Sequence, residues 1–205
     1  MERNSYLIMI KFYKQIISKQ TAQDIYHDFM GKIIKEHEEY VENEVPATSI
    51  DGETRGLGVL NLPSTLTEID KIKSIVEKDF GSHYEFTHSY MRLYPNNSVL
   101  HPHIDRKGLD LTLSVNIYSS ENTYWPLIIS NLEMKPDEEN EKFAVGDEKE
   151  SYKLLERFLK IYSEYNFDIG DGACCTREHP HWRPFYEMSF EGDHYMQCFY
   201  HWKLK

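Results

Sequence analysis

Apolar residues recur every three or four positions in two segments of the first third of the chain, which predicts two amphipathic helices. The first helix is expected to begin at Thr21, because a carboxylate follows it three residues later, as in an N-cap signature. The second is expected after Pro63 and ends at Gly81, since glycine suits a helix C-cap. Residues 6–17 predict a strand that leads into a turn, and residues 46–63 predict a loop. The expected apolar faces comprise Ile25, Phe29, Ile33 and Ile34 in the first helix and Leu66, Ile69, Ile72, Ile75, Val76 and Phe80 in the second.

From Tyr84 onwards the period of the pattern changes to two, which is typical of strands. Residues 132–165 interrupt the strands with an acidic, partly helical insertion. Helices followed by many short strands predict an α+β, mainly β fold, in which the helices pack on one face of a sandwich or barrel. We expect one domain over residues 1–205, with a strand and the helices in residues 1–82 and the β-rich core in residues 83–205. The strands are expected at Tyr84–Tyr94, Val99–Ile104, Leu109–Tyr118, Trp125–Ser130, Asn166–Ile169, Ala173–Thr176 and His194–Trp202.

Net charge, cysteine content and the length of apolar runs exclude some classes of partner and compartment. The chain has 34 acidic and 23 basic residues, a formal net charge of -11, and such a surface repels phosphate backbones, so a nucleic acid partner is not expected. Cys174, Cys175 and Cys198 are too few and too unevenly spaced for a disulfide framework, which favours a reducing compartment. The apolar run Leu7–Ile10 is too short for a signal peptide or a membrane span. We therefore expect a soluble, cytoplasmic protein with no membrane partner.

The segment LHPHIDRKG, residues 100–108, carries the most informative chemistry. On a strand, His103 and Asp105 point to the same face, and an imidazole with a carboxylate supplies two legs of a facial metal triad. His101 lies on the same face and forms a rival pair with His103. The third ligand is expected from a histidine distant in sequence, and the chain offers both His179 and His181 before its last predicted strand.

Six short motifs follow one another between residues 84 and 202. They are Tyr94-Pro95, His103-Ile104-Asp105-Arg106, Trp125-Pro126, Gly170-Asp171, His181-Trp182-Arg183 and Phe199-Tyr200-His201. In this order they resemble the iron(II)/2-oxoglutarate-dependent oxygenase superfamily, and most of all its small prolyl-4-hydroxylase-like and phage-type members. The resemblance implies a double-stranded β-helix, or jelly-roll, core with the N-terminal helices packed on one sheet.

The resemblance also implies that His103, Asp105 and His181 hold Fe(II), with 2-oxoglutarate and O2 as co-substrates. It implies that the Tyr94 hydroxyl reaches a carboxylate of 2-oxoglutarate. Related enzymes usually place an Arg or Lys about ten residues after the last histidine ligand to pair with the distal carboxylate, and residues 189–193 contain neither. Arg183 is therefore the first candidate, because a guanidinium fork pairs with a carboxylate through two hydrogen bonds. The alternatives are Arg92, His194 and Gln197, and Asn116 is expected to hydrogen-bond either the co-substrate or the backbone.

The implied reaction hydroxylates an unactivated C–H bond and yields succinate and CO2. The expected substrate is a peptide or protein side chain of the prolyl type, or a free amino acid or other small metabolite. A nucleobase in a polymer ranks third because of the net charge. Two rival hypotheses are a non-catalytic metal-binding or sensor barrel and a zinc- or manganese-dependent cupin-like enzyme. Cupins tend to offer three histidines and a glutamate, so Asp105 counts against the second rival.

Overall fold

The N-terminal third of the chain forms two helices, and a hydrogen bond from Thr21 to Glu68 links the start of the first to the start of the second. Helix α1 (Lys19–Asn43) begins after Ser18, whose hydroxyl accepts a hydrogen bond from the Thr21 backbone N–H. A short 3-10 helix, η1 (Pro63–Leu66), leads into α2 (Ile69–Phe80), and Gly81 ends α2 with a φ of 94°, a conformation that glycine adopts without strain. The computed structural model describes residues 10–43, 50–51, 56–95, 98, 100–119, 125–134, 158, 160–184 and 194–205.

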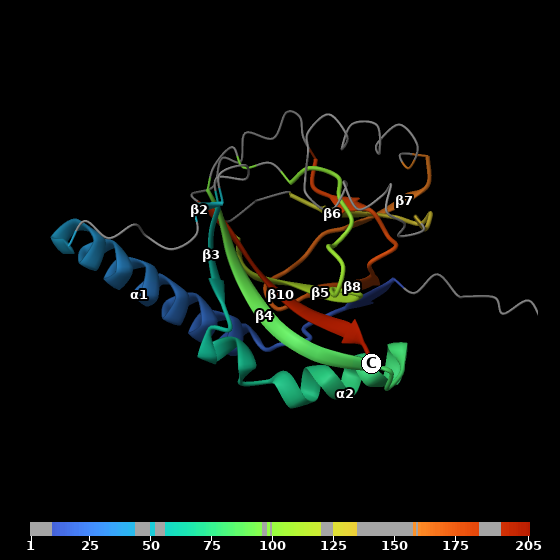
Figure 1. The fold of residues 1–205 in the computed structure, drawn as a ribbon, viewed down its shortest axis with the longest axis horizontal. Helices are drawn as coiled ribbons and strands as arrows, with labels where there is room; N and C mark the ends of the chain where they lie inside the picture. The colour runs from blue at the N-terminus through green and yellow to red at the C-terminus, as the bar shows by residue number, and fades with distance from the viewer. Residues whose placement is uncertain are drawn as a thin grey trace, which may run out of the picture.

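The strands form two antiparallel sheets (Figure 1). The larger sheet has the order β1-β8-β5-β10-β4-β3-β2, and the smaller has the order β7-β6-β9. The strands of the larger sheet are β1 (Lys11–Tyr13), β2 (Ile50–Asp51), β3 (Gly56–Leu60), β4 (Tyr84–Pro95), β5 (Leu111–Ser119), β8 (Gly172–Thr176) and β10 (His194–Leu204). Those of the smaller sheet are β6 (Leu127–Ser130), β7 (Tyr162–Tyr165) and β9 (His181–Trp182).

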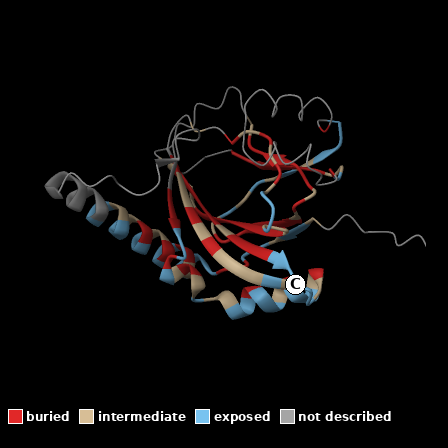
Figure 2. Ribbon diagram, in the orientation of Figure 1, coloured by how far each residue is buried: buried red, intermediate tan, exposed pale blue. Residues whose placement is uncertain are grey.

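Both helices cover one face of the larger sheet, and the smaller sheet lies on the other side (Figure 1). The apolar core between helices and sheet includes Ile25 and Phe29 of α1, which are fully buried against Met91, Cys198 and other residues of the central strands. Buried positions line the sheet and the helix surfaces that face it, whereas the outer helix surfaces are exposed (Figure 2). The fold is α+β and mainly β, with a jelly-roll core, as predicted.

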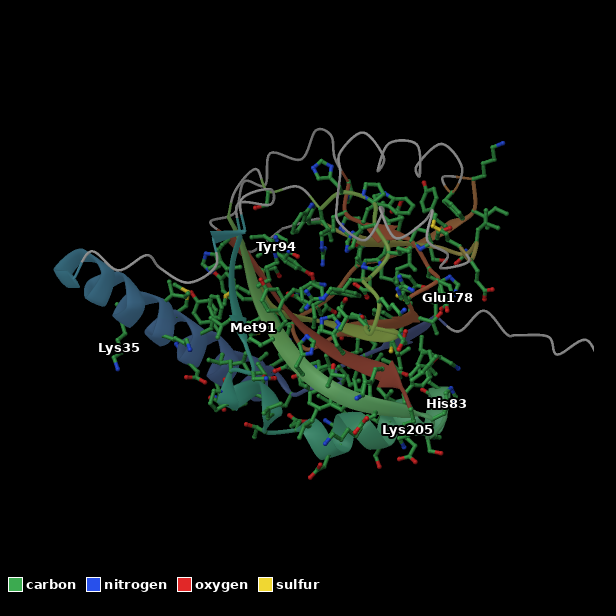
Figure 3. The ribbon with its side chains drawn as sticks, in the orientation of Figure 1. Lys35, His83, Met91, Tyr94, Glu178 and Lys205 are labelled. Atoms are coloured by element: carbon green, nitrogen blue, oxygen red, sulfur yellow. The ribbon has the colours of Figure 1, made fainter. Side chains whose placement is uncertain are left out.

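Strand alternation separates the two faces of the sheet. On β4, Met91 points to the helices while Arg92 and Tyr94 point to the space between the sheets. Tyr94 lies near the end of β4 that is farther from the C-terminus (Figure 3). This inner face carries the candidate site.

Several element predictions are wrong in detail. The expected loop at residues 46–63 contains β2 and β3, so part of the segment 1–82 belongs to the large sheet. No strand forms in residues 100–104, the described part of the strand expected at 99–104, and the strand expected at residues 166–169 lies at residues 162–165 instead. The segment 132–165 falls mostly outside the described residues. Of the strand and turn predicted at residues 6–17, residues 6–9 also lie outside them, and residues 11–13 form β1.

Helix α1 also differs from its prediction. It begins at Lys19, so Thr21 lies in the first turn, and the Thr21 hydroxyl donates to Glu68 instead of capping the helix. Ile34 is exposed, whereas it was expected on the apolar face. None of the helices within the described ranges combines the length and the apolar character needed to span a membrane.

Candidate metal centre and cavity

Three side chains from two distant segments converge between the sheets. His103, Asp105 and His181 each offer one ligand atom, and these atoms all lie within 4.8 Å of one another. His181 belongs to β9, whereas His103 and Asp105 lie in the irregular segment between β4 and β5. The backbones of His103 and His181 form an isolated antiparallel bridge, with N···O distances of 3.1 and 2.9 Å. The expected strand is therefore reduced to one bridge, which is nevertheless enough to align the ligands.

The two histidines are held in the tautomer that a metal requires. Nδ1 of His103 lies 2.7 Å from the carbonyl oxygen of His101, and Nδ1 of His181 lies 3.2 Å from that of His179. A carbonyl oxygen only accepts, so each Nδ1 carries the proton and each Nε2 presents a lone pair. Burial, together with the neighbouring His181, lowers the pKa of His103 to about 4, which keeps its imidazole neutral.

The carboxylate of Asp105 is oriented by a short chain of hydrogen bonds. The Thr112 hydroxyl donates to Oδ2 of Asp105 and lies 2.9 Å from Nδ1 of His201. Since the hydroxyl has one proton, which it gives to Asp105, Nδ1 of His201 is the donor in the second bond. Burial alone raises the pKa of Asp105, but the nearby His181, His201 and His103 outweigh it, so the pKa is lowered and the carboxylate is ionised.

The rival histidines lie outside the ligand group. His179 is buried and its Nδ1 lies 3.0 Å from the carbonyl oxygen of Ser130, so its ring is bound to β6 instead. His101 contributes its backbone carbonyl to His103, and its side chain is not among the clustered ligand atoms. The geometry thus groups His181, not His179, with His103 and Asp105, in line with the preference drawn from the sequence.

A cavity of about 450 Å³ opens beside the triad. Among its described lining residues, Asp105 is the only acidic side chain, whereas Arg92 and Arg106 are basic. Its walls come mainly from β4, from β10 and from the segment that carries the ligands. The lining residues are Gly58, Leu60, His88, Tyr90, Arg92, Tyr94, Leu100, His103, Asp105, Arg106, Leu109, His181, Phe199 and His201.

One end of the cavity is rich in buried polar groups. The Tyr94 hydroxyl is buried and has no hydrogen-bond partner in the described part of the chain. Cζ of Arg92 lies 5.0 Å from the Tyr94 ring centroid. Burial raises the pKa of Tyr94, and the positive charges of Arg92 and Arg183 oppose that rise, so both guanidinium groups act on this hydroxyl.

Two amide side chains, Gln197 and Asn116, follow Arg92 across neighbouring strands of the sheet. Gln197 on β10 pairs in register with Arg92 on one side and with Asn116 on the other. Gln197 is fully buried, and both heteroatoms of its amide lack a partner among the described residues. Asn116 donates from Nδ2 to the carbonyl oxygen of Phe167, at 3.1 Å, while its Oδ1 has no such bond. Asn116 therefore satisfies the backbone with its donor and leaves an acceptor unused.

Four residues that were candidates for binding the co-substrate do not line the cavity: Arg183, His194, Asn116 and Gln197. Arg183 is fully buried and stacks between Trp125 and Tyr195, with Cζ 4.5 and 4.4 Å from their ring centroids. It donates to the Trp125 carbonyl oxygen and to the Tyr195 hydroxyl. His194 stacks on Tyr26 of α1 and on Tyr118, so its side chain lies on the helix side of the sheet and the prediction for it is wrong. Arg92 and Tyr94 do line the cavity.

No protein-family model matches the chain, and no curated protein matches its sequence. Solved structures do match its fold. The non-heme α-ketoglutarate-dependent carbocyclase SnoK from nogalamycin biosynthesis superimposes with a TM-score of 0.66 at 12% identity, covering 95% of this chain and 79% of that one. HygX from Streptomyces hygroscopicus, with nickel, 2-oxoglutarate and hygromycin B bound, gives 0.60 at 11% identity, with 96% and 83% covered.

A viral collagen prolyl hydroxylase from Paramecium Bursaria Chlorella virus-1, in complex with 2-oxoglutarate, gives a TM-score of 0.58 at 11% identity, with 96% of each chain covered. At these identities the likeness establishes the fold and leaves the activity to be argued from the residues. The chain has the jelly-roll fold of the iron(II)/2-oxoglutarate-dependent oxygenases, over nearly its whole length.

Proposed function

We propose that this protein is an iron(II)- and 2-oxoglutarate-dependent dioxygenase that hydroxylates an unactivated C–H bond. The observation that carries the proposal is the triad His103, Asp105 and His181, with its ligand atoms within 4.8 Å of one another beside a cavity. Two imidazoles and one carboxylate are the facial donor set of non-heme Fe(II) oxygenases, which leaves coordination positions for other ligands.

The residues around the triad fit a divalent metal in further respects. Both Nε2 atoms are free to coordinate, because each Nδ1 is bound to a backbone carbonyl. The Asp105 carboxylate is ionised and oriented by Thr112. When bound, iron together with 2-oxoglutarate and O2 supplies oxidative decarboxylation to succinate and CO2, coupled to hydroxylation of the substrate. The chain supplies position and exclusion of water.

Arg92, Tyr94 and Gln197 suit the distal carboxylate of 2-oxoglutarate. Arg92 lines the cavity and offers a fork of N–H donors, and Tyr94 offers a hydroxyl with no partner in the described residues. The Gln197 amide, in register beside Arg92, can donate a third hydrogen bond. Arg183, which pairs with no carboxylate of the described chain, adds positive charge behind Tyr195. A buried cation with no acidic partner among the described residues, as Arg183 is, favours an anionic ligand.

The cavity volume of about 450 Å³ favours a small molecule or a single side chain over a folded surface or a base-paired polymer. Among the structural neighbours, one is named as a collagen prolyl hydroxylase and another contains an aminoglycoside, hygromycin B. Both kinds of substrate are compatible with the proposed reaction, and the net charge of -11 disfavours a nucleic acid.

The proposal is tested by incubating the protein with Fe(II), 2-oxoglutarate and O2 and measuring succinate, with or without a prime substrate. We expect slow succinate formation that His103→Ala abolishes, whereas His101→Ala, two residues away and outside the ligand group, retains it.

Arg92→Gln should raise the KM for 2-oxoglutarate roughly tenfold or more, and Arg92→Lys less, because lysine keeps the charge and loses the fork. Calorimetry with Mn(II) and 2-oxoglutarate provides a second readout, and absence of both binding and succinate would refute the proposal.

A further inference from the structure

The charge of the cavity is opposite in sign to that of the chain. The chain as a whole has 34 acidic and 23 basic residues, yet among the described lining residues two arginines face one carboxylate. That carboxylate, Asp105, belongs to the proposed metal site and is hydrogen-bonded to Thr112. The cavity therefore offers more positive charge than its own acidic group can balance.

The two arginines act on different histidines of the cavity. Arg92 is close to Tyr94, at one end of the β4 face, and its charge acts on His103. Arg106 acts instead on His88 and His201, which pair in register across β4 and β10 and whose ring centroids lie 4.8 Å apart. His88 and Arg92 are four residues apart on one strand, roughly 13 Å at the usual rise per residue. The Asp105 end of the triad is the one connected, through Thr112, to His201.

Arg106 follows Asp105 directly in the chain and its side chain is exposed to the cavity and to solvent. In the described part of the chain it makes no ion pair, and its backbone carbonyl accepts from the Leu109 N–H in a turn that fixes its position. Exposed arginines are common on protein surfaces, but this one lines a cavity beside the triad and acts on other histidines than Arg92, which we assign to 2-oxoglutarate.

We propose that the prime substrate is a small molecule bearing an anionic group, a carboxylate or a phosphate, which Arg106 binds with help from His88. The inference rests on the proposed function, because it assigns Arg92 to the co-substrate and Arg106 to the substrate. Between the two cations, the wall formed by Leu60, Tyr90 and Phe199 is apolar and aromatic. The substrate accordingly has an apolar body, which places its C–H bond near the triad while its anionic group is held at Arg106.

The walls and the volume of the cavity limit the size of that body. A methyl group on Gly58 would lie within 1.9 Å of the Tyr90 hydroxyl, so Tyr90 packs directly on the bare backbone of β3. The cavity must hold 2-oxoglutarate and substrate together in about 450 Å³, near the lower limit of small-molecule sites. A compact organic acid or phosphomonoester meets both the charge and the volume.

The test is calorimetric binding to the protein loaded with Mn(II) and 2-oxoglutarate, with a matched panel. Free amino acids, N-acetyl-amino acids and aromatic acids are each compared with their carboxamides, and phosphomonoesters with their parent alcohols. Acids are expected to bind at least about tenfold more tightly than their neutral partners, and the same compounds should stimulate succinate formation. The acid and phosphate arms show which anion is preferred.

Arg106→Gln should remove the preference for acids and Arg106→Lys should keep part of it. Lys107→Gln is the matched control, because Lys107 is the exposed neighbour that does not line the cavity. Equal binding of amides and acids, an unchanged preference in Arg106→Gln, or no binding by any acid would overturn the inference. Succinate formation without preference for acids would refute this inference alone. Preference for acids through Arg106 in a protein that makes no succinate would instead refute the proposed function.

Discussion

At the scale of single residues, Thr112 has a role that only a hydroxyl can fill. It donates to Asp105 and accepts from His201 at the same time, so it links the carboxylate of the triad to a histidine of the final strand. Such outer hydrogen bonds fix the orientation of a ligand and typically change metal affinity by 10–100-fold. Thr112 is buried, so no water replaces the hydroxyl freely.

Thr112→Val should therefore weaken metal binding by roughly tenfold or more, because valine keeps the shape and loses both hydrogen bonds. The measurement is a Mn(II) or Co(II) titration followed by calorimetry. Thr112→Ser should restore most of the affinity. Ser114→Ala, at the next position on the same face of β5, is the control for a general effect of substitution in this strand. Unchanged affinity in Thr112→Val would show that Thr112 does not orient the ligand.

The residue types of the site were predictable, and their partners were not. The spacing of His103 and Asp105 predicted a shared face, and alternation along β4 predicted that Arg92 and Tyr94 point the same way. His179 and His181 are two residues apart, so alternation places both on the same face of a strand. The choice between them therefore depended on the Trp182-Arg183 motif that follows His181. His194 was wrongly included because the register of β10 is absent from the sequence: Tyr195 pairs with Tyr94, so His194 faces the helices.

At the scale of elements, the N-terminus of α1 depends on one side chain. Ser18 accepts from the Thr21 N–H at 3.0 Å, and its own N–H donates to Glu68 at 3.3 Å. Ser18→Ala should lower the free energy of unfolding by about 1 kcal/mol, the usual cost of losing an N-cap. Urea denaturation measures it. Ser74→Ala, in the exposed middle of α2, should cost nothing because alanine has the higher helix propensity.

Elements with a long regular pattern were predicted well, and short ones were not. The alternating run of β4 and the amphipathic face of α2 appear at nearly the expected positions. Strands β2, β3 and β9 are short or rich in glycine, and they form only because longer strands offer them an edge. The sequence of residues 99–104 has a strand-like pattern, but Pro102 has no N–H to donate, and within the described residues 100–104 one bridge at His103 is all that forms.

At the scale of the whole molecule, the metal site joins the two sheets. His181 belongs to the smaller sheet, and Asp105 is connected through Thr112 to the larger. A metal that binds only the folded protein stabilises it by mass action, by about 2.7 kcal/mol at a free concentration of 100 times its Kd. Mn(II) should therefore raise the unfolding midpoint, and EDTA should reverse the effect.

His181→Ala should abolish the Mn(II)-dependent shift in unfolding, whereas His27→Ala, on the exposed side of α1, should retain it. Chemical denaturation at several Mn(II) concentrations measures the shift. A shift of equal size in His181→Ala would mean that the metal stabilises the protein from another place.

The position of β10 in the large sheet has a consequence for biosynthesis. This strand is the last of the described strands to leave the ribosome, yet it lies between β5 and β4 and makes the longest pairings in the sheet. Until it emerges, β4 and β5 present unpaired edges to other nascent chains, and such edges invite aggregation. The main sheet can therefore be completed only after β10 has been translated. Until then, the edges of β4 and β5 must be shielded from other chains if the protein is to avoid aggregation.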